Sequence, residues 1–183
     1  RYVELQVTSH FSFLRGASSC EELFAQAALA GIEALAVVDR NSLAGIVRAH
    51  EAAKTTGVRL IVGCRLDITD GMSVLVYPTD RPAYSRLCRL LSLGKRRGGK
   101  AKCLLEWQDL VAYGEGLIAV LVPDLADEEC GLRLRRLRDA FGDRAYLALT
   151  LRRRPNDQFR LHELSNLATQ MRVATVVTND VLF

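Results

Sequence analysis

Short apolar runs alternate with longer segments in which apolar residues recur at helical spacing, and this alternation continues along most of the chain. Several runs, such as residues 34–38, are apolar without interruption, which is typical of strands covered on both faces. The predicted strands are residues 3–7, 34–38, 58–62, 65–68, 72–77, 117–122, 146–151 and 173–177. The predicted helices cover residues 18–30, 41–56, 104–113, 126–141 and 157–171, with one more between Asp80 and Gly94.

Cap and turn residues mark where these elements begin and end. Ser18-Ser19 followed by two glutamates predicts a helix start, and Gly31 and Gly57 stand at typical helix ends. Asp70-Gly71 between two apolar runs predicts one antiparallel hairpin. The remaining short links favour a mostly parallel sheet, either doubly wound or closed into a barrel. No glycine-rich nucleotide-binding motif follows any predicted strand.

A basic, glycine-rich stretch interrupts the pattern at residues 94–102 and predicts a loop insertion near 95–102. Lysines and arginines bind nucleic-acid backbones without reading sequence, so this stretch could contact nucleic acid. It lacks interleaved aromatic residues, which argues against a stacking platform for single strands. A solvated, mobile loop is the alternative. The residues predicted for nucleic-acid contact are Lys95, Arg96, Arg97, Lys100 and Lys102.

Composition narrows the class of protein only moderately. A chain of 183 residues that is 49% hydrophobic and 25% charged is an ordinary globular domain. The net charge of +4 permits a polyanionic partner without requiring one. The five cysteines form no C-x-x-C pair, and no run has the length of a membrane span, so we expect reduced thiols and a cytoplasmic protein. The chain begins with Arg1 and ends just after a strand-like run, which suggests a piece of a longer protein.

Four motifs in order along the chain are similar to one known family. They are L-x-V-x-S-x-F-S-F-L-R-G-A-S, A-V-V-D-R-N-S-L-A-G, L-I-V-G-C-R and V-V-T-N-D-V-L-F. Together they resemble the N-terminal polymerase-and-histidinol-phosphatase (PHP) domain of bacterial C-family DNA polymerases. The F-S-F-L-R-G-A-S and L-G-K-R-R-G-G-K-A-K-C segments resemble the error-prone, damage-inducible branch most closely.

This resemblance implies a distorted seven-stranded (β/α) barrel whose strand ends, in active members, hold up to three metal ions for phosphoester hydrolysis. The family's first motif, His-x-His, falls on Gln6 and Thr8. The acidic residue before Gly-Ala falls on Arg15. The remaining expected ligand positions are Asp39, Arg40, Arg65, Asp180 and Leu182.

Only Asp39 and Asp180 keep a metal-binding side chain at these positions. We therefore expect no metal and no catalytic residue in this domain, with Arg15, Arg40 and Arg65 pairing with the two carboxylates. Three alternatives stay open. The two aspartates could simply cap turns, His10 could join them in a reduced phosphoesterase or 3′-5′ exonuclease site, and the basic stretch could make the domain a nucleic-acid-binding module.

The resemblance implies a single PHP-like domain over residues 1–183 that acts as a scaffold in a much longer error-prone DNA polymerase. Such a polymerase serves DNA repair and translesion synthesis after DNA damage. Its partners would be the polymerase core of the same chain, DNA, mutagenesis accessory proteins and the sliding clamp, with no membrane. The scaffold domain needs no cofactor, whereas the parent polymerase would use Mg²⁺ outside this chain.

Overall fold

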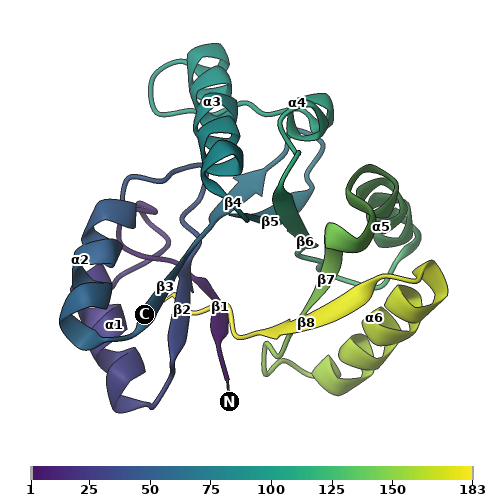
Figure 1. Ribbon diagram of the computed structural model, residues 1–183. Coiled ribbons are helices and arrows are strands. Elements are labelled where there is room, and N and C mark those ends of the chain that lie inside the picture. The colour runs from purple at the N-terminus through teal and green to yellow at the C-terminus, as the bar shows by residue number, and fades with distance from the viewer. Residues whose placement is uncertain (1, 183) are drawn as a thin grey trace. The chain divides into compact units, whose positions relative to one another are not determined.

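The computed structural model describes residues 2–182 of the chain. Its strands and helices follow one another in the order β1 (Glu4–Val7), α1 (Cys20–Leu29), β2 (Ala34–Val37), α2 (Ile46–Thr56), β3 (Arg59–Val62), β4 (Cys64–Asp67), β5 (Ser73–Pro78), α3 (Arg81–Gly98), α4 (Trp107–Ala112), β6 (Leu117–Leu121), α5 (Glu128–Phe141), η1 (Gly142–Arg144), β7 (Ala145–Thr150), α6 (Asp157–Met171) and β8 (Ala174–Thr178). The chain divides into two compact units (Figure 1). The first holds residues 2–65 and 179–182, and the second holds residues 66–178.

The first unit is built on a parallel sheet in the order β1–β2–β3. Helices α1 and α2 pack against each other and against this sheet (Figure 1). Phe24 of α1 and Val37 of β2 are fully buried between them, as expected for a strand with no polar face. On its other edge β1 pairs with the end of the chain, because Val7 forms a parallel bridge with Val181.

Local sequence explains where the helices of this unit begin and end. Ser19 caps α1, and its side chain and that of Glu22 form the reciprocal bonds of a capping box. Gly57 ends α2 in the left-handed conformation that the sequence predicted for a C-terminal glycine. The start predicted for α2 is wrong, because α2 begins at Ile46 and not near residue 41. Asn41 has a positive φ of 49°, which places it outside the helix.

The second unit has a five-stranded sheet in the order β4–β5–β6–β7–β8. β5 and β6 are antiparallel, whereas β6, β7 and β8 are parallel, with α5 and α6 packed against them (Figure 1). The predicted turn at Asp70-Gly71 joins β4 to β5. Its geometry is fixed by Ile68 N donating to Met72 O at 2.8 Å and by Met72 N donating to Asp70 Oδ1 at 3.0 Å. The predicted hairpin turn is therefore confirmed.

The predicted distorted, seven-stranded barrel differs from the strand pairing of the described residues. Within residues 2–182, eight strands pair into sheets of three and five strands, and strand pairing closes no barrel. β3 and β4 are separate strands because Gly63 lies between them. The α/β class and the predominance of parallel pairing agree with the sequence pattern.

The predicted basic loop near 95–102 is also partly wrong. Helix α3 continues through Lys95, Arg96 and Arg97 to Gly98, so only the residues after it form a loop. Gly94 looked like a helix breaker, but it is a packing residue. A Cβ atom there would lie 2.6 Å from the side chain of Leu105.

No helix among residues 2–182 is long and apolar enough to cross a membrane.

Candidate functional site

The carboxylate of Asp39, just after β2, is held by two serines from the segment after β1. Asp39 is 2% exposed. Its Oδ1 accepts from the backbone N of Ser9 at 2.9 Å and from Ser12 Oγ at 2.7 Å, and its Oδ2 accepts from Ser9 Oγ at 2.8 Å. Ser12 Oγ in turn accepts from the backbone N of Arg40 at 2.9 Å. Three neutral donors therefore occupy the oxygens that would otherwise bind a cation.

Burial raises the pKa of Asp39, although the hydrogen bonds from Ser12 and Ser9 act in the opposite direction. The space around the carboxylate is also restricted. A Cβ at Gly45 would lie 2.9 Å from Asp39 Oδ2 and 2.9 Å from the ring of Phe11. A Cβ at Gly16 would lie 2.2 Å from Ser9 O, so the loop that supplies the serines closes tightly on itself. Asp39 is thus closely packed, with little room beside its carboxylate.

The second carboxylate, Asp180, is held by an amide and a guanidinium. Gln6 is fully buried, and its Nε2 donates to Asp180 Oδ1 at 2.6 Å. Arg65 Nη1 lies 3.6 Å from the same oxygen. The backbone around Asp180 is tied to β1, because Val181 N donates to Gln6 O at 2.8 Å and Thr8 N donates to Val181 O at 2.9 Å. We call Gln6, Ser9, Ser12, Asp39, Arg65 and Asp180 the strand-end cluster.

The other predicted site residues take different places in the first unit. Thr8 is buried beside β1. Arg15 is exposed, and its backbone N donates to Ser12 O. Arg40 and Leu182 are half-buried. Each of them has a backbone contact in the unit, since Arg40 bridges to Arg65 and Leu182 O accepts from Ala17 N. The expected pairing of arginines with both carboxylates therefore holds for Arg65 with Asp180, whereas Asp39 is bound by serines.

His10 does not complete a reduced metal site with the two aspartates. It is exposed, and its Nδ1 lies 3.2 Å from Ser18 O. Its ring packs on Phe11 with 4.6 Å between ring centroids. Among the described residues, no three His, Cys, Asp or Glu side chains gather where they could hold a metal ion.

The residues at the family's ligand positions do not fit a two- or three-metal centre. Asp39 already accepts three hydrogen bonds, and Asp180 is shared between Gln6 and Arg65. A cation near Asp180 would meet the guanidinium of Arg65, which repels it. Amide and hydroxyl groups at Gln6 and Thr8 replace imidazoles, which are much better ligands for transition metals.

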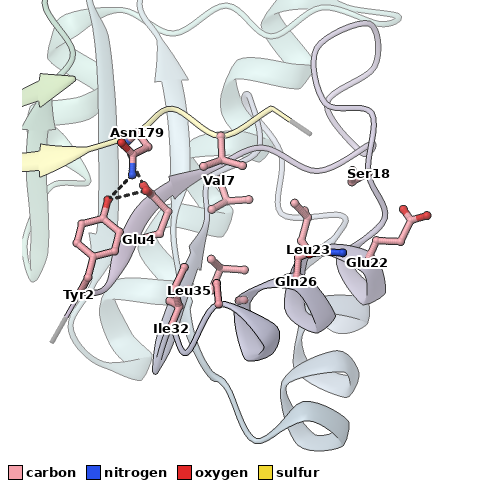
Figure 2. Close-up of a pocket in the computed structure, with 13 residues that line it drawn as sticks. Tyr2, Glu4, Val7, Ser18, Glu22, Leu23, Gln26, Ile32, Leu35 and Asn179 are labelled. Atoms are coloured by element: carbon pink, nitrogen blue, oxygen red, sulfur yellow. Dashed lines mark hydrogen bonds between the residues drawn. The ribbon is translucent and has the colours of Figure 1, made fainter. Parts of the chain in front are cut away.

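The sequence analysis did not single out Glu4, a buried acidic residue at the start of β1. Glu4 is 2% exposed, and its carboxylate accepts from Tyr2 Oη at 2.6 Å and from the backbone N of Gln6 at 2.8 Å. Asn179 Nδ2 donates to Tyr2 Oη at 2.9 Å (Figure 2). These residues form the polar end of a cavity of about 280 Å³ whose other walls include Leu23 and Leu35. The signal in the sequence was an acidic residue, Glu4, inside an otherwise apolar predicted strand. Through Glu4 and Tyr2, β1 is hydrogen-bonded to Asn179 near the end of the chain.

Comparison with known proteins places these observations in a family. Residues 4–153 match the PHP domain family. This match covers most of the chain and includes every residue of the strand-end cluster except Asp180. The chain therefore belongs to the PHP domain family.

Named relatives of high identity are error-prone DNA polymerases. The chain is 71% identical to error-prone DNA polymerase 2 of Rhizobium meliloti and 73% identical to error-prone DNA polymerase 1 of Agrobacterium fabrum, in each case over 183 residues. It is 45% identical to an error-prone DNA polymerase of Caulobacter vibrioides. Each match covers 100% of this chain but 17% of the relative, so the chain spans about one sixth of the length of these polymerases.

Two solved structures share the fold at low sequence identity. One is an amidohydrolase from Chromobacterium violaceum, with a TM-score of 0.73 and 16% identity over 100% of this chain and 88% of that one. The other, from Bifidobacterium adolescentis, is proposed to be a metal-dependent phosphoesterase. Its TM-score is 0.72, with 14% identity over 98% of this chain and 87% of that one. At these identities the likeness describes the fold and does not assign an activity.

Proposed function

We propose that this PHP domain is a metal-free, non-catalytic scaffold within an error-prone DNA polymerase. The polymerase would act in damage-induced mutagenesis and translesion synthesis. The domain would support the polymerase core of the same chain. Polymerisation itself would use Mg²⁺ bound by residues outside this chain. The identity of about 70% to error-prone polymerases supports the parentage of the domain.

One observation carries the non-catalytic assignment. At the positions where the family resemblance expects metal ligands, Asp39 is bound by Ser9 and Ser12. Hydrolysis of a phosphoester by a metal pair needs open coordination positions for substrate and water. Such a metal pair must first be held by carboxylate oxygens, and the buried carboxylate of Asp39 already accepts three protein hydrogen bonds. The strand-end cluster therefore supports packing of the first unit in place of chemistry.

The proposal is tested by measuring metal content and hydrolysis on the same protein. The 183-residue chain is purified without chelator, its zinc and manganese are measured by mass spectrometry, and cleavage of 3′-labelled DNA is followed with added Mn²⁺. We expect neither stoichiometric metal nor 3′-end degradation. Two or three equivalents of metal, together with DNA cleavage that is lost in the Asp39→Asn, Asp180→Asn double variant, would overturn the proposal.

A matched control restores the ligands that the family resemblance implies. The variant carries Gln6→His, Thr8→His, Arg15→Glu, Arg40→His, Arg65→Glu and Leu182→His. It should bind zinc or manganese more tightly than the natural chain in a calorimetric titration, because it replaces three cationic positions with ligands. Equal metal binding by both chains would show that these positions do not control metal affinity, and it would contradict the argument made from them.

A further inference from the structure

Positive charge is concentrated in α3 and the loop that follows it. Residues 81–105 contain eight lysines and arginines and no aspartate or glutamate, whereas the whole chain has a net charge of +4. The rest of the chain is therefore net negative. Such a concentration on one element creates a local positive potential that the overall charge does not show.

The cations of α3 fall into two groups. Arg86 and Arg97 lie on the flank of the helix and are neutralised within the unit. Arg86 pairs with Glu115, and Arg97 makes two hydrogen bonds to Asp109 at 2.5 and 3.1 Å. Arg89 and Arg96 belong to the other group. They are exposed, and no described acidic side chain lies within ion-pair distance of either guanidinium.

Helical geometry places the second group on the outer face. Arg89 and Arg96 are seven residues, or about two turns, apart, which separates their Cα atoms by roughly 10 Å along one side of the helix. The opposite side carries Leu87 and Leu90, which are fully buried. Helix α3 stands at the edge of its unit with α4 beside its C-terminal end (Figure 1). The exposed cations that this face and the following loop present are Arg81, Arg89, Lys95, Arg96, Lys100 and Lys102, here called the α3 basic face.

We propose that the α3 basic face binds the sugar-phosphate backbone of duplex DNA without reading its sequence. The face presents six exposed cations in a segment that contains no aspartate or glutamate, and duplex DNA offers a dense row of phosphates. This inference adds a contact to the proposed scaffold role. It does not depend on whether the strand-end cluster binds metal.

Other polyanionic partners fit this face less well. Single strands need aromatic platforms, and Tyr84, the aromatic residue of α3, is only 36% exposed. Interfacial helices bind a membrane by combining positive charge with an exposed apolar face, but the apolar side of α3 is buried against its own unit. A specific protein partner usually inserts around apolar anchors, and the face presents charged and small polar side chains such as Ser85 and Ser92.

The test measures binding of the 183-residue chain to a fluorescent DNA duplex by anisotropy across a salt series. The triple variant Arg89→Gln, Lys95→Gln, Arg96→Gln removes three cations from the face. Each lost phosphate contact reduces the slope of log affinity against log salt by about 0.9, so the slope should fall by about 2 to 3. At low salt the affinity should fall at least tenfold, by roughly 1.4 kcal/mol or more.

The matched control also removes three positive charges, but from exposed residues outside the α3 basic face. It carries Lys54→Gln, Arg59→Gln and Arg135→Gln. It should keep most of the salt slope, and both variants should keep the helical circular dichroism and melting temperature of the natural chain. Three results would overturn the proposal: no salt-dependent duplex binding, an equal loss in the control variant, or binding of a polyglutamate peptide as tight as that of the duplex.

Discussion

Asp39 in the first unit and Asp157 in the second are both buried, but different kinds of donor stabilise their carboxylates. Asp39 in the first unit receives only neutral donors, namely two serine hydroxyls and one backbone amide. Asp157 in the second unit is 6% exposed. It accepts from Arg160 Nε at 2.8 Å, from the backbone N of Arg153 at 2.8 Å and from the backbone N of Arg152. Both carboxylates accept from backbone amides. The side-chain donors differ, because Asp39 accepts from serine hydroxyls and Asp157 accepts from a guanidinium.

The difference appears in the pKa of each group. Burial raises the pKa of Asp39, and the hydrogen bonds from the serines only partly offset it. Burial also acts to raise the pKa of Asp157, but the bonds from Arg160 and from the backbone amides outweigh it, so that pKa is lowered. Neutral donors can thus satisfy a buried carboxylate and still leave its pKa raised, whereas a charged donor lowers the pKa.

The largest effect is expected from removing the carboxylate of Asp39. Asp39→Ala leaves three donors in a buried place without an acceptor, which should lower the free energy of unfolding by about 3 to 5 kcal/mol. Urea denaturation measures this loss. Asp39→Asn keeps one oxygen and should lose about 1 to 2 kcal/mol. A loss below about 1 kcal/mol in Asp39→Ala would show that the hydrogen bonds to Asp39 do not matter to stability.

Packing around Asp39 is tested by Gly45→Ala. The new methyl group would approach Asp39 Oδ2 and the Phe11 ring at 2.9 Å, so stability should fall by about 1 to 3 kcal/mol. Gly131→Ala in α5 is the matched control, because its Cβ would have no neighbour closer than 3.6 Å. This control should gain up to about 1 kcal/mol from helix propensity. An unchanged urea midpoint in Gly45→Ala would mean that the site is looser than these distances indicate.

The guanidinium at Asp157 is tested by Arg160→Gln. This change removes the charged donor but leaves the backbone donors of residues 152 and 153. The pKa of Asp157 should rise, because burial then acts with less compensation. Carbon-13 NMR titration of the aspartate side chains measures the pKa of Asp157 in the natural chain and in the variant. A pKa of Asp157 that does not move would indicate that the two backbone amides alone set it.

The smallest effect is a difference in pH dependence. Asp157 has a lowered pKa, so its stabilising contribution is present above the unfolded value and is lost as the pH falls through its folded value. Asp39 has a raised pKa, so its ionised form opposes folding near neutral pH, and this cost disappears as the pH falls toward the unfolded value. Between about pH 7 and pH 4 the natural chain should therefore gain stability relative to Asp39→Asn.

The matched measurement uses Asp157→Asn in the same urea series. Here the advantage of the natural chain should stay constant near neutral pH and shrink below about pH 4, because only then does Asp157 take up its proton. Parallel pH profiles for Asp39→Asn and Asp157→Asn would remove the contrast between the two carboxylates.

Much of the fold could be predicted from local sequence signals. The bounds of α6 agree with the predicted residues 157–171, and the cap at Ser19 and the turn at Asp70-Gly71 are correct. These features depend on neighbouring residues, so a short window contains the relevant information. The sequence pattern also gave the order of strands and helices in both units.

The errors arose where distant residues decide the outcome. Gly94 within a basic run resembles a loop, but contact with Leu105 and the pairing of Arg97 with Asp109 keep α3 helical through it. The donors to Asp39 were likewise missed, because Ser9 and Ser12 lie about 30 residues before it and small hydroxyl residues carry no distinctive signal. The family resemblance implied which positions to inspect, whereas the contacts of Asp39 depend on residues that are distant in sequence.

The pairing of β1 with the segment around Val181 has a consequence for how the chain folds. Gln6 and Asp180 are 174 residues apart in sequence, yet they share a hydrogen bond and their backbones lie side by side. During synthesis β1 keeps an unpaired edge until almost the whole of this chain has left the ribosome. Contacts of such sequence separation form slowly, because a long loop must close before they contribute any stability. The first unit is therefore the last of the two to be completed, although its residues are the first to be made.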